Sequence, residues 1–370
     1  MIAVEMLPGG NGDALVVEYG TDAKTHQLLI DAGTYHAWNG VRKELIRRDG
    51  DRYEIFVVTH VDEDHIGGAI AVLDDPDLRG RVGKVWFNGF VHCESGGNVL
   101  GPVNGEQLTG RIVSGPFEWN QGFTPNTFTP NASKHVGGPV VLPSDGELRS
   151  IGLPGGARVV LLSPSGPKLK AMAEKWREDV TKAGLEPGGG SPGHTWGPTP
   201  RPPVFEPLPD PLDCAAVKTL AAKKNTDGSR ANGSSIAFVL EYGGKRVLFG
   251  ADAHAPQLTG ALQRYARRVR ETRPRFDLVK LSHHGSNANL STAMLRLIDC
   301  RRFLISTNGE RFDHPDHAAI AKVIAAYDDP VTFYCNYRTV RTEPWEKKGP
   351  AVGATFKFPK AKQQFIRVTA

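Results

Sequence analysis

Short apolar stretches separated by Gly and Asn turn signals dominate the first sixty residues and predict β-strands. These stretches cover residues 2–7, 14–20, 26–33 and 54–60. We expect them to form an antiparallel meander that feeds one sheet. A helix that begins near His65 follows the last of them.

Strand-like and helix-like stretches alternate over the rest of the chain. Further strands are expected at residues 84–90, 157–165, 235–242, 246–252, 277–285, 301–307, 331–337, 353–358 and 364–369. Helical stretches are expected at residues 168–184, 255–270, 290–298 and 315–327. Strands followed by helices in both halves predict an α/β fold with two sheets packed face to face and helices outside.

Two segments interrupt this alternation. Residues 92–150 are rich in Gly, Asn, Pro and Thr with little periodicity, and we interpret them as a long insertion over one face. Residues 185–212 contain so much Pro and Gly that an extended loop is expected. The whole chain, residues 1–370, is then one domain with two loop-rich insertions.

Composition limits the classes of protein only weakly. A hydrophobic content of 39% in 370 residues is enough for a substantial core, and the chain has neither a membrane span nor a signal peptide, which predicts a cytoplasmic protein without a membrane partner. Four scattered cysteines without a CxxC pair predict reduced, mostly buried thiols. A net charge of +5 leaves an anionic substrate open. The arginines of residues 264–268 are read either as a solvated helix face or as contacts to a phosphate backbone.

The stretch THVDEDHIGG, residues 59–68, carries the densest ionisable chemistry. Side chains alternate along a strand, so His60 and Asp62 would point the same way, while Asp64 and His65 would turn in at the start of the following helix. Imidazoles and carboxylates suit divalent zinc, manganese or iron, and two such sub-clusters could hold two ions. The alternative is a set of helix-capping acids with surface histidines.

Later strands end in residues of the same kind. Asp252 ends one strand and could bridge two ions, and His283 and His284 end another. Loops at strand ends are where active sites are commonly built.

These motifs together resemble the metallo-β-lactamase superfamily, and specifically its branch related to the soluble domain of the ComEC DNA-uptake proteins. The superfamily motif HxHxDH is matched by HVDEDH, with Asp62 where a histidine is usual, as in the ComEC-like branch. Five further segments resemble motifs of that branch and follow in the same order: NGDA at residues 11–14, LIDAG ending at Gly33, NGSS at 232–235, GAD ending at Asp252 and HHGS at 283–286. A last element resembles Asn308, Arg311, Phe312, His314 and Pro315.

The resemblance implies an αββα sandwich with a dinuclear site at one sheet edge. His60 and Asp62 would hold one ion, Asp64 and His65 the other, and Asp252 would bridge them. His284 would be the last ligand because it directly precedes the glycine, and His283 would then contact a ligand rather than an ion.

One histidine that the superfamily usually provides is missing just before residue 234. Asn232 and Ser234 stand there instead, either as turn residues or as donors to a substrate oxygen. His194, His92 and His135 are weaker candidates for the missing ligand, so one ion could be weakly held or absent.

Several other residues are expected around the ions. Asp31, and by the same reasoning Asp13, could hydrogen-bond a ligating imidazole, although each also suits an ordinary turn. His314 would donate a proton to a leaving oxygen or bind a phosphate, or else belong to a loop before the next helix. Asn308 and Arg311 complete this substrate-facing group.

The predicted function is a metal-dependent hydrolase with two divalent ions, Zn or Mn. Water activated between the ions would attack a phosphodiester, with Asp64 and His314 as the expected catalytic residues, and the resemblance makes nucleic acid the first substrate to consider. Two alternatives remain. The substrate could be a small phosphodiester, a nucleotide or another ester, or the chain could be a metal-stabilised module without catalysis.

Overall fold

A computed structural model describes residues 1–48, 52–93, 103–124, 136–183, 202 and 204–370, and within them the strands form two sheets. The seven-stranded sheet has the order β15-β1-β2-β3-β4-β5-β6 and the eight-stranded sheet the order β14-β13-β12-β11-β10-β9-β8-β7 in the part described. The strands of the first sheet are β1 Ile2–Met6, β2 Leu15–Thr21, β3 Lys24–Ile30, β4 Tyr53–Val57, β5 Lys84–Trp86, β6 Glu118–Trp119 and β15 Ile366–Thr369. Those of the second are β7 Ser150–Gly152, β8 Arg158–Ser163, β9 Ala237–Tyr242, β10 Lys245–Phe249, β11 Leu278–Lys280, β12 Arg302–Ile305, β13 Val331–Cys335 and β14 Ala354–Lys357.

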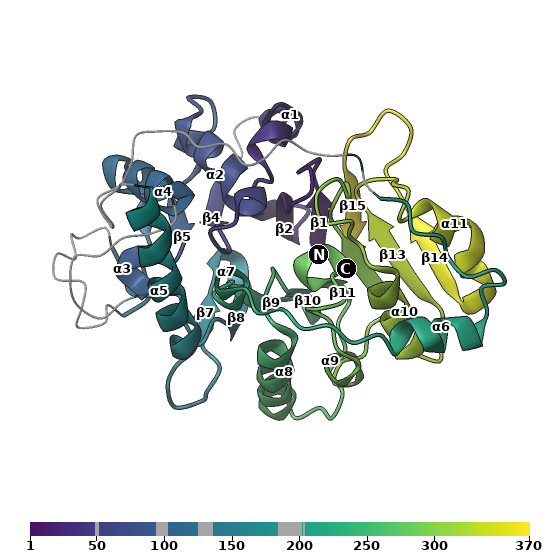
Figure 1. The fold of residues 1–370 in the computed structure, drawn as a ribbon. Helices are drawn as coiled ribbons and strands as arrows, with labels where there is room; N and C mark the ends of the chain where they lie inside the picture. The colour runs from purple at the N-terminus through teal and green to yellow at the C-terminus, as the bar shows by residue number, and fades with distance from the viewer. Residues whose placement is uncertain (49–51, 94–102, 125–135, 184–201, 203) are drawn as a thin grey trace.

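Helices lie on the outer faces of the two sheets (Figure 1). Those on the side of the first sheet are α1 Trp38–Ile46, α2 Glu63–Asp74, α3 Phe90–Cys93, α4 Val103–Ser114 and α5 Gly166–Lys182. The other α-helices are α6 Cys214–Ala221, α7 Arg230–Gly233, α8 Ala255–Val269, α9 Thr292–Arg296, α10 His317–Ala325 and α11 Glu343–Lys348. Short 3-10 turns are η1 Tyr35–Ala37, η2 Arg79–Arg81, η3 Pro154–Gly156, η4 Ser282–Gly285 and η5 Gly349–Val352.

The alternation of side chains along β2 shows how the layers pack. Val17 joins the large core that fills the space between the sheets, together with Leu161 of β8 and Val247 of β10. Its neighbour Val16 faces the opposite way and packs with Ile66 of α2 in a second core. The predicted fold class, two sheets packed face to face between outer helices, is confirmed.

The predicted meander is wrong at its last strand. Strands β1, β2 and β3 are antiparallel, but β4 runs parallel to β3. Helix α1, which lies between them in the chain, provides the crossover that a parallel pair requires. This helix was not expected from the sequence.

Residues 92–150, interpreted from the sequence as a loop-rich insertion, also contain regular elements. Helix α4 buries Leu108 and Ile112 in the second core, and β6 extends the first sheet parallel to β5. Residues 94–102 and 125–135, which include His135, lie outside the described part of the chain. Most of the predicted extended loop at 185–212 and its His194 also lie outside it.

The first sheet ends on a strand from the far end of the chain. Strand β15 pairs antiparallel with β1, in register Ala3 with Thr369, and the two termini lie close together in Figure 1. The cysteines follow the prediction, since all four are free thiols and all except Cys214 are buried. No helix in the described ranges is both long and apolar enough to span a bilayer.

Candidate metal centre

The candidate centre lies where parallel strands of both sheets end. Asp31 follows β3, and His60 lies beyond the end of β4, from which the chain enters α2 with Asp64 and His65 in its first turn. In the second sheet, Asp252 follows β10, and η4 after β11 carries the two adjacent histidines. Because β3 and β4 are parallel, as are β10 and β11, each pair delivers its carboxyl ends to one edge.

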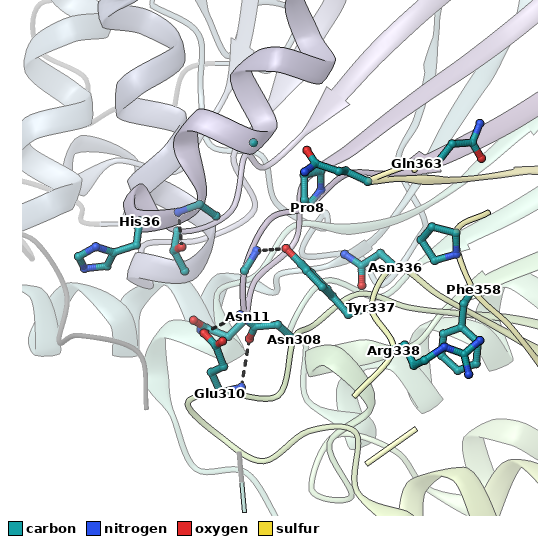
Figure 2. A pocket seen from close by; sticks show the side chains of 16 residues that line it. Pro8, Asn11, His36, Asn308, Glu310, Asn336, Tyr337, Arg338, Phe358 and Gln363 are labelled. Carbon is teal, nitrogen blue, oxygen red and sulfur yellow. Dashed lines mark hydrogen bonds between the residues drawn. The ribbon is translucent and has the colours of Figure 1, made fainter. Parts of the chain in front are cut away.

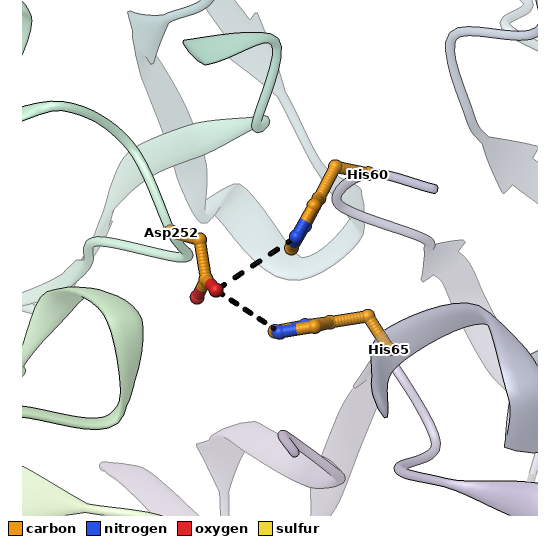
Figure 3. Close-up of side chains that lie close together, drawn as sticks. All are labelled: His60, His65 and Asp252. Carbon is orange, nitrogen blue, oxygen red and sulfur yellow. Dashed lines mark ion pairs between the residues drawn. The ribbon is translucent and has the colours of Figure 1, made fainter. Parts of the chain in front are cut away.

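Four imidazoles surround one carboxylate oxygen. The distances from Asp252 Oδ2 to the Nε2 atoms of His60, His65, His283 and His284 are 3.8, 3.5, 3.6 and 3.7 Å. Figure 3 shows the Asp252 carboxylate facing His60 and His65, with which it forms a buried group able to hold an ion. The segments 60–65 and 252–284, far apart in sequence, therefore meet at one point.

These spacings fit a cation better than hydrogen bonds. Separations of 3.5 to 3.8 Å are long for hydrogen bonds. Ligand atoms around a tetrahedral ion at about 2.0–2.1 Å lie about 3.3–3.4 Å from one another, close to what is seen here. His60 Nε2 and Asp252 Oδ1 are buried without a hydrogen-bond partner among the residues described, as expected of atoms that await a cation.

Asp64 completes a second buried group with His65 and His284. His284 Nε2 is 3.4 Å from Asp64 Oδ2 and 3.2 Å from His65 Nε2. Asn11 Nδ2 donates to Asp64 Oδ2 over 3.1 Å, which fixes the orientation of the carboxylate. The two groups of potential ligands share His65 and adjoin at Asp252.

Hydrogen bonds from behind orient the imidazoles. Asp31 Oδ2 lies 2.8 Å from His65 Nδ1, and the same carboxylate accepts from the backbone N–H and the hydroxyl of Thr59. The backbone oxygen of Ser306 lies 2.9 Å from His284 Nδ1. With protons on the Nδ1 atoms, the Nε2 lone pairs face the centre, the arrangement typical of ligating histidines.

The charges of the centre favour protonated imidazoles when no cation is bound. Burial lowers the pKa of His65, but the carboxylates of Asp252 and Asp31 outweigh burial and raise that pKa well above its ordinary value. Against the same effect of burial, Asp252 and Asp13 raise the pKa of His284 to about 9. Protons hold the positions that a divalent cation would take, so binding of a cation should release protons.

A buried ion pair lies behind His284. Lys280 Nζ donates to Asp13 Oδ2 over 2.7 Å, and Asp13 Oδ1 is 3.3 Å from His284 Nδ1. Burial alone would raise the pKa of Asp13, but Lys280 and His284 outweigh it and hold the pKa well below its usual range. Asp13 therefore stays an anion beside a candidate ligand.

Of the remaining predicted residues, Asp62 lies at the exposed rim and His314 is buried beside His283. Asp62 is 43% exposed, with Oδ2 at 3.6 Å from His60 Nε2, and the His314 ring lies 5.1 Å from that of His283. Arg311 approaches Glu63 at 3.8 Å.

Asn232 lies beside His283, whereas the hydrogen bond of the Ser234 side chain is local. Asn232 Nδ2 donates to Asp227 over 2.7 Å and lies 3.4 Å from His283, while the Ser234 hydroxyl donates to the backbone of Ala231. His92 is buried next to Trp119, where its ring lies 4.6 Å from the indole, and its contacts are not with the centre.

Sequence reasoning missed Lys280, Asp227 and Asn289. A lysine inside the apolar stretch of β11 was a usable signal, because a buried lysine needs a counter-charge. Asp227 and Asn289 lie in loops without a motif, and only the folded chain brings them beside His283.

A cavity of about 580 Å³ is lined in part by Asn11 (Figure 2). Because the side chain of Asn11 also donates to Asp64, the cavity adjoins the centre. Its wall includes Asn308, Arg338 and Phe358. The Tyr337 hydroxyl in the same wall accepts from the backbone N–H of Gly10 over 3.0 Å. Polar amides beside an aromatic ring make this cavity a candidate place for part of a substrate.

Comparisons with known proteins add little to these observations. No protein-family model matches the chain, and no curated protein matches it. One similar solved structure is the CmlA beta-hydroxylase E377D mutant, with 11% sequence identity and a TM-score of 0.40; the match covers 100% of this chain and 54% of that chain. This chain thus spans about half the length of that protein. The side chains described above support a metal centre, and membership of the metallo-β-lactamase superfamily stays a prediction.

Proposed function

We propose that the protein is a metal-dependent hydrolase of phosphodiesters that uses two divalent ions, zinc or manganese. The observation that carries this proposal is the convergence of four imidazole Nε2 atoms on Asp252 Oδ2 at ligand-like spacing. His60 and Asp62 would hold one ion, Asp64, His65 and His284 the other, and Asp252 would lie between them.

Divalent ions bound there would supply an activated water and positive charge opposite the phosphate oxygens. The chain itself positions the ligands. Asp31 and the backbone oxygen of Ser306 hold His65 and His284 in one orientation, and Asn11 does the same for Asp64. The carboxylates of Asp62, Asp64 and Asp252 bring three negative charges, and an activated hydroxide would add a fourth, so two divalent ions would leave a neutral centre that can accept an anionic ester.

The rim provides groups that could bind such an ester. His314 is next to His283, and exposed Phe312 lies beside both rings. We assign His314 a hydrogen bond to a phosphate or leaving-group oxygen, and the cavity that adjoins Asn11 one side of the diester.

Metal analysis combined with hydrolysis tests the proposal. The purified protein should contain divalent metal and hydrolyse bis(p-nitrophenyl) phosphate, and DNA or RNA as well if nucleic acid is the substrate. Asp64→Asn should lose at least ~100-fold of this activity and part of the metal. Asp22→Asn, a change at an exposed turn between β2 and β3, should lose neither. A wild-type protein that binds no divalent ion would refute the proposal.

The salt dependence of activity separates the substrate classes. Binding of a polyanion weakens steeply with added salt, because protein contacts to phosphates release counterions. We therefore expect a steep fall in kcat/KM for DNA or RNA between 50 and 200 mM salt, of roughly tenfold or more, if nucleic acid is the substrate. A flat profile with good turnover of a small diester would favour the small-substrate alternative.

A further inference from the structure

The two proposed ion sites differ in their number of ligands, and His283 is a candidate ligand for the site that has fewer. Asp64, His65 and His284 form one set with the shared Asp252, whereas the motif supplies only His60 and Asp62 to the other set. What we infer about this second set rests on the proposed metal centre.

His283 approaches the shared carboxylate as closely as the other imidazoles do. Its Nε2 atom is 3.6 Å from Asp252 Oδ2, within the range of 3.5 to 3.8 Å that His65, His284 and His60 show. Its side chain is 19% exposed, so it lies on the solvent side of the centre, as Asp62 does.

The hydrogen bonds of Asn289 fix the tautomer of His283. Asn289 Nδ2 donates to Asp227 Oδ2 over 2.7 Å and to the backbone oxygen of Asp252 over 3.0 Å, so both of its N–H groups face acceptors. Its Oδ1 atom, 2.8 Å from His283 Nδ1, must then be the acceptor. His283 therefore carries its proton on Nδ1, and the lone pair of Nε2 points at Asp252.

The backbone explains how neighbouring histidines reach one carboxylate. His283 and His284 both have left-handed conformations, with φ of 47° and 55°. Successive side chains of an extended strand would point in opposite directions. Two consecutive non-glycine residues in the left-handed region are strained, and such strain is concentrated at functional sites.

We propose that His283 Nε2 is a direct ligand of the ion held by His60 and Asp62, and thereby replaces the histidine missing before residue 234. The HHG pair is then divided, with His283 serving one ion and His284 the other. This assignment replaces the expectation that His283 only contacts a ligand.

Asn232 is the rival ligand, because its Oδ1 atom is buried and has no hydrogen-bond partner in the described part of the chain. Its Nδ2 atom is committed to Asp227. Ser234 is a weaker rival, since its hydroxyl donates to the backbone of Ala231. A variant of Asn232 therefore belongs in the test.

Metal binding itself provides the test. Metal-free protein is titrated with Zn²⁺ and with Mn²⁺ in a calorimeter, and bound metal is counted after gel filtration. We expect two ions for the wild type and one tightly held ion for His283→Ala, with the affinity for the other ion reduced at least ~100-fold. With Mn²⁺, the electron paramagnetic resonance spectrum should change from that of a coupled pair to that of an isolated ion.

The matched control is His254→Ala. His254 is also a buried histidine near Asp227, but its Nδ1 atom lies 3.1 Å from Lys168 Nζ and its Nε2 atom 3.7 Å from Asp227 Oδ2. This variant should keep both ions. His283→Gln, whose side chain is polar and of similar length, repeats the test if the alanine variant unfolds, which circular dichroism would reveal.

The outcomes separate this inference from the proposed function. If the wild type binds two ions and both His283 variants bind two with unchanged affinity, His283 is not a ligand although the metal centre stands. Loss of one ion in Asn232→Ala, with both ions kept in His283→Ala, would assign the position to Asn232 instead. A wild type that binds no ion would refute the metal centre and this inference together.

Discussion

Gly12 lies against the backbone of Asp64, at the start of the helix that carries two candidate ligands. A Cβ atom added at Gly12 would lie 1.5 Å from the carbonyl oxygen of Asp64 and 2.9 Å from its Cβ. No rotation of a side chain relieves such a clash with backbone. The glycine of the NGDA motif is therefore required for a close approach between two segments rather than for a turn alone.

We predict that Gly12→Ala displaces the start of α2 and lowers the free energy of unfolding by about 1–3 kcal/mol, as overpacking does. Metal affinity should fall with it, because Asp64 and His65 move. Urea denaturation and metal titration measure the two effects. Gly80→Ala is the control, since a Cβ at Gly80 meets nothing within 4 Å. Equal behaviour of the two variants would contradict this account.

Asp31 lies behind the candidate centre, with its carboxylate 2.8 Å from His65 Nδ1. We predict that Asp31→Ala weakens the binding of the ion next to His65 by about 10–100-fold, because the imidazole loses the partner that fixes its tautomer. Competition with a chromophoric zinc chelator measures the affinity. An unchanged affinity would show that Thr59 and the packing around His65 are sufficient to orient the ring.

At the scale of elements, alternation of apolar and polar residues predicted the central strands but not α4. The α4 sequence VNGEQLTGRIVS contains glycines, which have low helix propensity. The structure explains Gly105, because a Cβ there would lie 2.6 Å from Trp176 of α5. Trp176 Nε1 also donates to Glu106 of α4. Tertiary packing overrides local propensity at this helix, and no local pattern reports such a contact.

The candidate centre, like the fold, could be predicted from the sequence only in part. His60, Asp62, Asp64 and His65 were predictable because they occupy six consecutive positions, and Asp252 because it ends a strand. The partners of His283 were not, because Asn289 and Asp227 acquire their roles only from the loops that place them side by side. Motifs indicate candidate ligands, whereas long-range contacts determine which way their side chains face.

Strands β1, β2 and β15 share a buried ionic network on the first sheet. Glu5 of β1 is 3% exposed and accepts from Arg48, while Arg48 also donates to Glu18 of β2 over 2.6 Å. We predict that Arg48→Ala lowers the free energy of unfolding by about 1.5–3 kcal/mol, because Glu5 loses one charged hydrogen-bond partner but keeps Arg47 and Arg367. Lys347→Ala, which removes an exposed pair with Glu343, should cost at most about 0.5 kcal/mol. Urea denaturation compares the two.

The same network predicts a dependence of stability on pH. Burial alone would raise the pKa of Glu18, but Arg367 and Arg48 outweigh it and lower the pKa below its ordinary value of 4.5. Since the folded-state pKa is below the unfolded one, the stabilisation is fully present above that ordinary value and is lost as the pH falls through the folded pKa. The difference in unfolding free energy between wild type and Glu18→Gln should therefore shrink between pH 6 and pH 3. A constant difference would contradict the pairing.

At the scale of the whole molecule, the centre joins the two sheets. His60 and His65 belong to the first sheet and its helix, while Asp252 and His284 follow strands of the second. The two cations held between these residues would link the sheets, and they would bind the folded chain but not the unfolded one. Each ion should then stabilise the fold by about 2.7 kcal/mol at a free concentration 100 times its Kd.

We accordingly predict that a chelator lowers the Tm of the protein and that added Zn²⁺ or Mn²⁺ restores it. Calorimetry at rising metal concentrations measures the shift. Asp252→Asn should show a much smaller response to metal, because the carboxylate between the two sets is gone. A Tm that does not depend on metal in the wild type would contradict the role of the cations as links between the sheets.

The pairing of β15 with β1 bears on how the protein acquires its structure. Strand β15, residues 366–369, forms the edge of the first sheet by pairing with β1, which begins at residue 2. This edge forms only after two segments separated by nearly the whole chain come into contact. Contacts between such distant segments slow folding, because a long loop must close before they stabilise anything. Refolding from denaturant should accordingly be slow, with the outermost strand of the first sheet among the last pieces to be added.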